Sequence, residues 1–170
     1  MVVIAGLVYL DPVDYCRIRR LVCNYNEFEV FLMNYDSDNI FAKILRKELP
    51  SEIVIEDLNT LVIMDIMPRT DGHMLVIPKT PCRNILDATR DQLTACIAMV
   101  QKISRGAMNA FKADGITVQQ FSEAAGGQEV FHLHFHILPR RNGVQLRPHD
   151  GVMADPELLK EQAERIRLVI

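Results

Sequence analysis

Apolar residues recur along the chain at two spacings, which predict helices and strands respectively. Apolar positions three and four residues apart predict helices at about 36–49, 89–112 and 155–169. Short continuous or alternating apolar runs predict strands at 53–55, 61–66, 73–77, 116–120 and 129–138. Turn clusters join several of these strands directly, which favours antiparallel pairing. The expected fold is therefore α+β, with a five-stranded antiparallel meander sheet, one long helix and shorter helices.

Capping residues and apolar faces refine the predicted helices. The first helix has good N-cap residues at 36–38 and Pro50 at its end. Thr89 and Gln92 form a capping box for the long helix, and Gly115 lies just past its end. The long helix is expected to bury Leu93, Ile97, Val100, Ile103, Met108 and Phe111. The C-terminal helix is expected to bury Leu158, Leu159, Ala163, Ile166 and Val169.

The first 32 residues differ from the rest because their apolar positions follow neither spacing clearly. From Met33 onward, polar residues precede the first predicted helix and the pattern becomes regular. This change predicts an N-terminal extension at 1–32 and a main domain at 33–170 that includes the C-terminal helix. Residues 1–10 are apolar but lack the basic stretch and the small-residue cleavage site of a signal peptide, so a cytoplasmic protein is expected.

Composition narrows the class of protein. The chain has 170 residues, of which 49% are hydrophobic and 24% charged, and its formal net charge is -3. This apolar fraction supports an ordinary core, and the low net charge argues against disorder. The mildly acidic composition disfavours nucleic acid as a partner, and no apolar run approaches the roughly 20 residues that cross a membrane. The four cysteines form no C-x-x-C pair and are expected to be reduced.

Three of the five histidines stand at alternate positions, His132, His134 and His136. Successive side chains of a strand point to opposite faces, so these imidazoles are expected to share one face. The opposite face would hold the neighbouring apolar residues Phe131, Leu133, Phe135 and Ile137. Because a slip of one residue would bury all three imidazoles, the apolar face sets the register, and the histidine face should open to solvent or to a pocket.

Three imidazoles on one face admit three roles. They could form a solvated polar surface, two of them could bind zinc with a third ligand, or one could attack phosphorus as a neutral nucleophile. A glycine-bearing segment at 122–128 precedes them, and its backbone amides could approach an anion closely. Arg140 and Arg141 follow them and add positive charge. These neighbours favour phosphate chemistry over a zinc site.

Residues 132–138 match the signature His-φ-His-φ-His-φ-φ, where φ is apolar, of the histidine-triad nucleotide-binding family. Residues 39–50 resemble the first helix of that family, and residues 65–79 resemble a further block of it. Residues 126–130 lead into the triad as they do in the family. Over about 36–140, the chain therefore resembles a histidine-triad (HIT) protein of the Hint-like bacterial type.

The resemblance implies an enzyme that acts on nucleotides without a metal or cofactor. Members of the family are homodimers that bind nucleoside monophosphates, so the expected partners are a purine nucleotide and a second copy of the chain. The Hint-like type implies hydrolysis of nucleoside phosphoramidates or nucleotidyl-amine adducts. The alternatives are a dinucleoside polyphosphate hydrolase and a nucleotide-binding or interaction protein with weak catalysis.

The resemblance also implies roles for individual residues. His134 would be the nucleophile that forms a nucleotidyl-histidine intermediate. His132 and His136 would contact the phosphate, and His136 would also transfer a proton to the leaving group. The implied nucleotide-binding residues are Asp65 at the ribose hydroxyls, Ile40, Phe41 and Ile66 around the base, Gln128 in the glycine-bearing loop, and His73 in support of the triad.

A few positions depart from the family pattern. Phe121 stands where many members carry an asparagine, so a polar contact to the phosphate is either lost or moved to Ser122. Glu129 and Val130 occupy the stretch where some members carry a hydroxyl residue, which bears on activation of the leaving group. Asn39 and Ala42 replace the cysteines that bind structural zinc in some bacterial members, so no structural zinc is expected.

Overall fold

The structure is a computed structural model that describes residues 3–4, 7–8, 35–148 and 151–170. The chain divides into two compact units, 1–33 and 34–170. In the first unit, strands β1 (Val3–Ile4) and β2 (Leu7–Val8) pair antiparallel. The rest of the predicted N-terminal extension lies outside the described residues, so the division at residue 33 as a domain boundary stays a prediction. None of the described helices is long and apolar enough to span a membrane.

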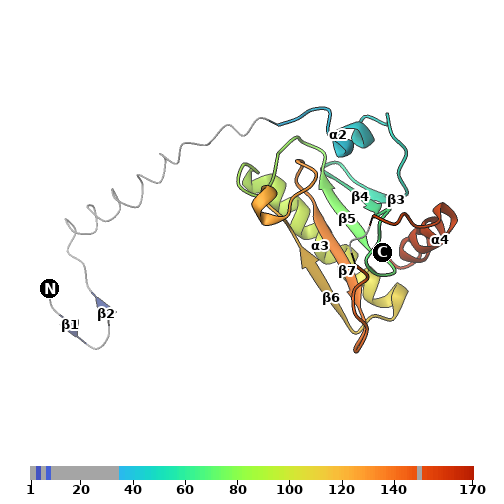
Figure 1. Cartoon of the computed structure of the whole chain (residues 1–170). Coiled ribbons are helices and arrows are strands. Elements are labelled where there is room, and N and C mark those ends of the chain that lie inside the picture. Colours follow the sequence, from blue (N-terminus) through green and yellow to red (C-terminus); the bar gives the residue numbers. More distant parts are fainter. Residues whose placement is uncertain (1–2, 5–6, 9–34, 149–150) are drawn as a thin grey trace. The chain divides into compact units, whose positions relative to one another are not determined.

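The second unit contains a five-stranded antiparallel sheet, which confirms the predicted α+β class (Figure 1). Its strands are β3 (Ile53–Glu56), β4 (Thr60–Met64), β5 (Met74–Pro78), β6 (Gly115–Gln119) and β7 (Phe135–Arg140). Their order in the sheet is β3-β4-β5-β7-β6. The meander order therefore holds for β3, β4 and β5, whereas β7 lies between β5 and β6. The long helix between β5 and β6 carries the chain across the sheet, so that β6 forms the edge. Strand β7 then lies between β5 and β6.

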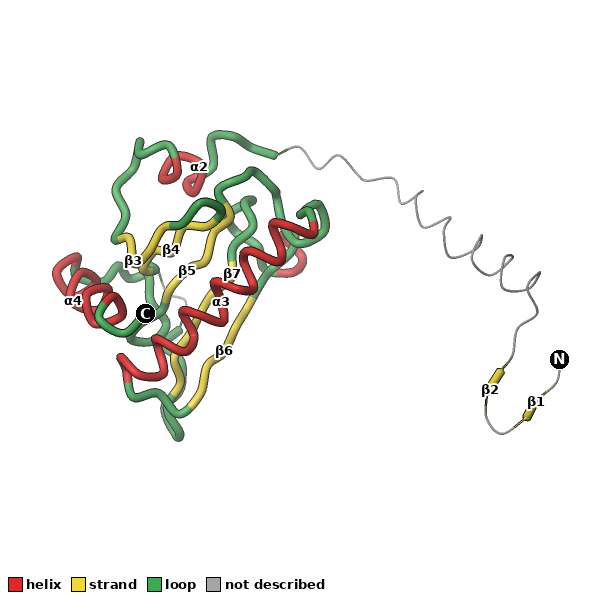
Figure 2. Tube along the Cα trace, turned by 180° about the vertical axis from the view of Figure 1, so that it is seen from behind, coloured by secondary structure: helices red, strands yellow, loops and turns green. Residues whose placement is uncertain are grey.

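Helix α3 (Arg90–Phe111) crosses one face of the sheet and packs against β5 and β7 (Figure 2). The predicted capping box is present, because the side chains of Thr89 and Gln92 each accept a hydrogen bond from the other's backbone N–H. The helix ends at Lys112, whose φ of 48° is left-handed, and not at a glycine. Its buried residues are Cys96, Met99, Val100, Ile103, Gly106, Ala107 and Phe111. Ile97 was predicted to be buried but is 52% exposed. The face of the helix that packs against the sheet contains Cys96 and Val100 instead.

Helix α2 (Ile40–Leu45) begins later than its sequence suggests. Its N-cap is Asn39, whose Oδ1 accepts a hydrogen bond from the N–H of Ala42 at 2.9 Å. The predicted cap at 36–38 is therefore wrong. Asp36 instead closes the turn before the helix, since its carbonyl oxygen accepts a hydrogen bond from the N–H of Asn39.

Helix α4 (Pro156–Arg167) packs against β3 and α3. Three of its five predicted apolar positions are buried, but Leu158 and Val169 are each 44% exposed. Gln162 is buried in addition, and its Oε1 accepts a hydrogen bond from the N–H of Gly72 at 2.8 Å. Gly72 has a φ of 74° in the turn between β4 and β5. Helix α4 therefore supports the turn that leads into the candidate site.

Apolar side chains pack on both faces of the sheet. The larger cluster joins the sheet to α3 and α4 and includes Val62, Met64, Met74 and Val76. The smaller cluster consists of Phe41, Leu61, Ile63, Leu75 and Ile77. Strands β4 and β5 are buried at every position, which explains why their sequences are continuous apolar runs. Helix α2 contributes Phe41 to the smaller cluster, and the candidate site lies on this side of the sheet.

Candidate active site

A cavity of about 490 Å³ is lined by α2, the end of β4, the start of β5 and the segment that enters β7. The predicted site residues in its wall are Ile40, Phe41, Asp65, Ile66, His73, His134 and His136. His132 and Gln128 are absent from the wall. The fold thus brings together most of the positions that the resemblance implies, from four separate segments of the chain.

Strand β7 begins at Phe135, so the predicted strand at 129–138 is too long at its start. The apolar residues between and after the histidines are buried in the larger cluster, as the alternation predicts; they are Leu133, Phe135 and Ile137. His134 and His136 line the cavity on the opposite side. Two of the three imidazoles therefore follow the predicted alternation.

His134 is held in one tautomer by the main chain. Its Nδ1 lies 2.7 Å from the carbonyl oxygen of His132, and because a carbonyl only accepts, Nδ1 carries the proton. The lone pair of the ring is therefore on Nε2. The ring of Phe41 meets this imidazole edge to face, with 4.9 Å between ring centroids. Burial lowers the pKa of His134, so the ring stays neutral at pH 7, which is the form that a nucleophile needs.

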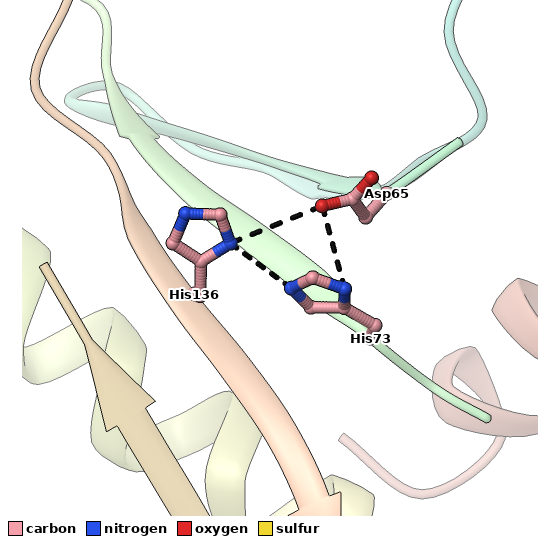
Figure 3. A group of neighbouring side chains, drawn as sticks. All are labelled: Asp65, His73 and His136. Carbon is pink, nitrogen blue, oxygen red and sulfur yellow. Dashed lines mark hydrogen bonds and ion pairs between the residues drawn. The ribbon is translucent and has the colours of Figure 1, made fainter. Parts of the chain in front are cut away.

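His136 belongs to a network with His73 and Asp65 (Figure 3). Its Nδ1 lies 3.0 Å from Nε2 of His73. The backbone N–H of Arg69 donates to Nδ1 of His73 at 3.3 Å, so in the neutral ring of His73 the proton is on Nε2. That Nε2–H donates to Nδ1 of His136. A neutral His136 therefore carries its own proton on Nε2.

Asp65 follows β4 and places a carboxylate beside both histidines. Its Oδ2 lies 3.4 Å from Nδ1 of His73 and 3.9 Å from Nδ1 of His136. Its Oδ1 accepts a hydrogen bond from the N–H of Met67 at 2.8 Å. Each of the three side chains offers one possible metal ligand, and these atoms lie within 4.8 Å of one another. A metal ion here would compete with the hydrogen bond between the two histidines.

His132 is buried behind the cavity, which corrects the prediction that three imidazoles share an open face. Its Nε2 lies 2.9 Å from the carbonyl oxygen of Pro78, and its Nδ1 lies 2.5 Å from the hydroxyl of Tyr35. Burial lowers its pKa to about 4, so the ring is neutral. The physical reason is that both ring nitrogens of His132 have hydrogen-bond partners away from the cavity, at Pro78 and at Tyr35. His132 is therefore placed to hold the chain from behind the cavity wall, and its predicted contact with the phosphate stays a prediction.

The burial of His132 is expected to make the protein less stable in acid. The pKa of this histidine is about 6.5 in the unfolded chain and about 4 in the folded one, so between these values the unfolded chain binds more protons. The free energy of unfolding should therefore fall as the pH drops from about 7 to about 4, by about 3 kcal/mol from His132 alone. Urea denaturation at a series of pH values measures this. A His132→Gln variant, which does not titrate there, should have a shallower dependence, and an unchanged slope would contradict the assignment.

Gln128 holds the glycine-bearing loop, and its predicted role at the nucleotide stays a prediction. Its side chain is buried, and its Nε2 donates to the carbonyl oxygens of Arg83 and Val130. Its Oε1 accepts hydrogen bonds from the side chain of Asn84 and from the N–H of Glu123. These four hydrogen bonds occupy the side-chain amide fully.

Several residues at the site were not predicted as site residues. Arg69 and Glu129 line the cavity, and Phe121 meets the ring of His136 edge to face at 5.6 Å between centroids. Phe121 and Glu129 were visible in the sequence as departures from the family pattern. Arg69 and Tyr35 carry no such signal, because turn residues follow no periodic pattern and Tyr35 meets its partner 97 residues away.

Three comparisons with known proteins bear on this site. The family model described as the HIT domain matches residues 46–143. An uncharacterized HIT-like protein of Borreliella burgdorferi is 36% identical over 137 residues, which cover 78% of this chain and 99% of that protein. The adenosine 5'-monophosphoramidase HNT1 of Saccharomyces cerevisiae is 34% identical over 107 residues, 63% of this chain and 65% of that protein.

The solved structures include a close structural match. The crystal structure of a HIT-like protein involved in cell-cycle regulation from Bartonella henselae is 51% identical to this chain and superimposes with a TM-score of 0.77. The match covers 80% of this chain and 98% of that one. With the family model, these matches establish that the chain belongs to the HIT domain family.

Proposed function

We propose that the protein is a nucleotide-binding hydrolase that cleaves the P–N bond of nucleoside phosphoramidates or nucleotidyl-amine adducts. The observation that carries the proposal is the hydrogen bond of 2.7 Å from Nδ1–H of His134 to the carbonyl oxygen of His132. It directs the lone pair of His134 to Nε2, in a cavity wall that also contains His136. A neutral imidazole in this form can attack phosphorus and form a covalent nucleotidyl-histidine.

The network of Asp65, His73 and His136 can store the proton that an amine leaving group needs. When one proton is added, His136 is protonated on both nitrogens and its Nδ1–H can donate to Nε2 of His73 across the same 3.0 Å. His73 then carries its proton on Nδ1, 3.4 Å from Oδ2 of Asp65, in exchange for the hydrogen bond that this nitrogen accepted from the N–H of Arg69. The carboxylate offsets the added charge. The network of Asp65, His73 and His136 is neutral while it holds this proton and carries one negative charge after His136 donates it as a general acid.

Two displacements at phosphorus complete the proposed reaction. In the first, Nε2 of His134 forms a bond to phosphorus, the P–N bond to the amine breaks, and the departing nitrogen takes the proton from Nε2 of His136. In the second, water attacks phosphorus while the bond to His134 breaks, and Nε2 of His136 accepts the proton from the water. The nucleoside monophosphate is released, and both imidazoles return to their starting states.

The cavity has the composition that a nucleoside monophosphate requires. Its volume of about 490 Å³ lies in the usual range for small-molecule sites. Ile40, Phe41 and Ile66 offer apolar surface for a base, and Asp65 offers a carboxylate that can accept hydrogen bonds from two ribose hydroxyls. The names of two relatives support hydrolysis: the yeast phosphoramidase, and a HIT family hydrolase from Clostridium thermocellum that is 29% identical with a TM-score of 0.56.

We also infer that the protein is a homodimer. Strand β6 forms one edge of the sheet, and its Val118 is 45% exposed. An unpaired edge strand can pair with the same strand of a second copy. Sedimentation analysis of the full chain should give twice the mass of the monomer, and a monomer at micromolar concentration would contradict the inference.

Turnover of two substrates tests the proposed function. The full-length protein is incubated with a fluorogenic adenosine phosphoramidate and, separately, with a diadenosine polyphosphate, with and without a metal chelator. The expected result is release of AMP from the phosphoramidate at a rate that the chelator does not lower. Faster cleavage of the dinucleotide would favour the alternative hydrolase, and AMP binding without turnover of either substrate would exclude the enzyme.

The pH dependence of turnover should reflect the buried nucleophile. In acid, Nε2 of His134 binds a proton and no longer has a lone pair for the attack. The value of kcat/KM should therefore fall as this group becomes protonated in the free enzyme. Burial lowers the pKa of His134, so the acid limb should lie below the ordinary histidine value of about 6.5. A rate profile from acid to neutral pH measures the limb. A midpoint at or above the ordinary value would contradict His134 as the buried nucleophile.

A further inference from the structure

Tyr35 contacts the triad from a part of the chain that the HIT domain model does not match, since the matched region begins at residue 46. Its hydroxyl lies 2.5 Å from Nδ1 of His132. The two rings also meet edge to face, with 5.5 Å between centroids. Neither residue lines the cavity. The contact therefore lies behind the site and not in it.

The hydrogen-bond roles around His132 follow from its other partner. The carbonyl oxygen of Pro78 only accepts, so Nε2 of His132 carries the proton across the 2.9 Å between them. The neutral ring then has its lone pair on Nδ1, and the hydroxyl of Tyr35 must donate to it. Burial raises the pKa of Tyr35, which keeps this hydroxyl protonated. The ring of His132 is thus fixed in one tautomer from both sides.

The main chain next to His132 is held by the segment that contains Pro78 and Cys82. The N–H of Leu133 donates to the carbonyl oxygen of Cys82 at 2.9 Å, and Cys82 lies shortly after Pro78. The carbonyl oxygen of His132 points to the next histidine and accepts the Nδ1–H of His134 at 2.7 Å. The direction of the His134 ring therefore depends on where His132 holds its carbonyl group.

We propose that Tyr35 is a positioning residue for His134 and acts through His132. The proposal rests on the proposed function, in which Nε2 of His134 attacks phosphorus. Without the hydroxyl, Nδ1 of His132 is a buried acceptor with no donor, a state that proteins avoid. The ring can relieve it only by rotating or by changing tautomer, and either change disturbs the bond to Pro78. The carbonyl that orients His134 then loses its fixed place, which lowers the rate of attack more than substrate affinity.

The test compares Tyr35→Phe with the unmodified full chain. The phenyl ring keeps the packing against His132 and removes only the hydroxyl. The matched control is Thr60→Val, which removes another buried hydroxyl whose hydrogen bond to Asp57 lies away from the cavity. The measurements are kcat and KM on the adenosine phosphoramidate and the tautomers of His132 and His134, from nitrogen-15 spectra of the imidazole rings.

We expect kcat of Tyr35→Phe to fall about tenfold, as for partners that orient metal-binding histidines, with KM little changed. The unmodified protein should show only the Nε2–H tautomer at His132 and only the Nδ1–H tautomer at His134, and the variant should show a second form of each. Thr60→Val should change neither readout. A variant that loses thermal stability but keeps kcat and both tautomers would overturn the proposal.

The two proposals fail in different ways. If the unmodified protein does not cleave the phosphoramidate, the proposed function is wrong, while the ring spectra still decide whether Tyr35 sets the two tautomers. An Nδ1–H tautomer at His132 in the unmodified protein would overturn the role of Tyr35 without any variant. If turnover is present and the tautomers are as stated, kcat of Tyr35→Phe decides the positioning role.

Discussion

Replacing His134 by alanine is expected to lower kcat on an adenosine phosphoramidate by roughly 10³- to 10⁶-fold, the range seen when a covalent nucleophile is removed. The variant loses the imidazole whose Nδ1–H is bound by the main chain and whose lone pair is on Nε2 in the cavity wall. Water must then displace the amine directly. AMP should still bind, because Ile40, Phe41 and Asp65 remain in the cavity wall. Initial rates and calorimetric titration with AMP measure the two effects.

A covalent adduct and a second variant make this prediction specific to His134. Reaction mixtures quenched in alkali, where phosphoramidates of histidine survive, should contain a nucleotidyl group on the peptide that carries His134 and none in the alanine variant. His136→Ala serves as the comparison. It should still form the adduct and should lose less rate on a substrate whose leaving group needs no proton. An adduct on another residue, or equal turnover in His134→Ala, would remove the covalent mechanism.

Replacing Leu133 by alanine is expected to lower the free energy of unfolding by about 3 kcal/mol. Leu133 lies between two histidines of the triad, and its side chain is fully buried in the larger apolar cluster. The substitution removes apolar surface from the core and leaves a cavity that packed neighbours fill only in part. Urea denaturation at pH 7 gives the free energy of the variant and of the unmodified protein.

Leu58→Ala is the matched control for Leu133→Ala. It makes the same chemical change at a side chain that is 88% exposed, so the free energy of unfolding should change little. Equal losses in the two variants would mean that Leu133 does not face the core. That result would also contradict the alternation that directs His134 and His136 to the cavity.

Much of the local structure could be predicted from the sequence because its causes are local. The capping box of α3 joins Thr89 to Gln92, three residues apart, and is present as predicted. The alternation around the triad predicted which of its residues enter the core, because strand geometry repeats every two residues. The prediction errors at helix ends also involve only a few neighbouring residues. Asn39 caps α2 in place of earlier polar residues that are equally suitable by type.

A site residue could be predicted only where its place on a strand, or its match to the family pattern, already directs its side chain to the site. His134 and His136 line the cavity as the alternation implies, and Asp65 lies beside them as the resemblance implies. Gln128 and His132 have residue types that suit a nucleotide site, yet both are buried in hydrogen bonds to distant segments. These hydrogen-bond partners are determined by how distant segments pack together, and the spacing of residues along the sequence does not reveal that packing.

The sequence by itself determined the α+β class, the order and approximate positions of the strands and helices, and the alternating histidines, because each follows from the geometry of a few neighbouring residues. The tertiary structure alone decided that β7 enters between β5 and β6, that His132 is neutral and buried, and that Tyr35 lies against it. These features depend on contacts between segments up to 97 residues apart, where burial and hydrogen-bond satisfaction outweigh local preference.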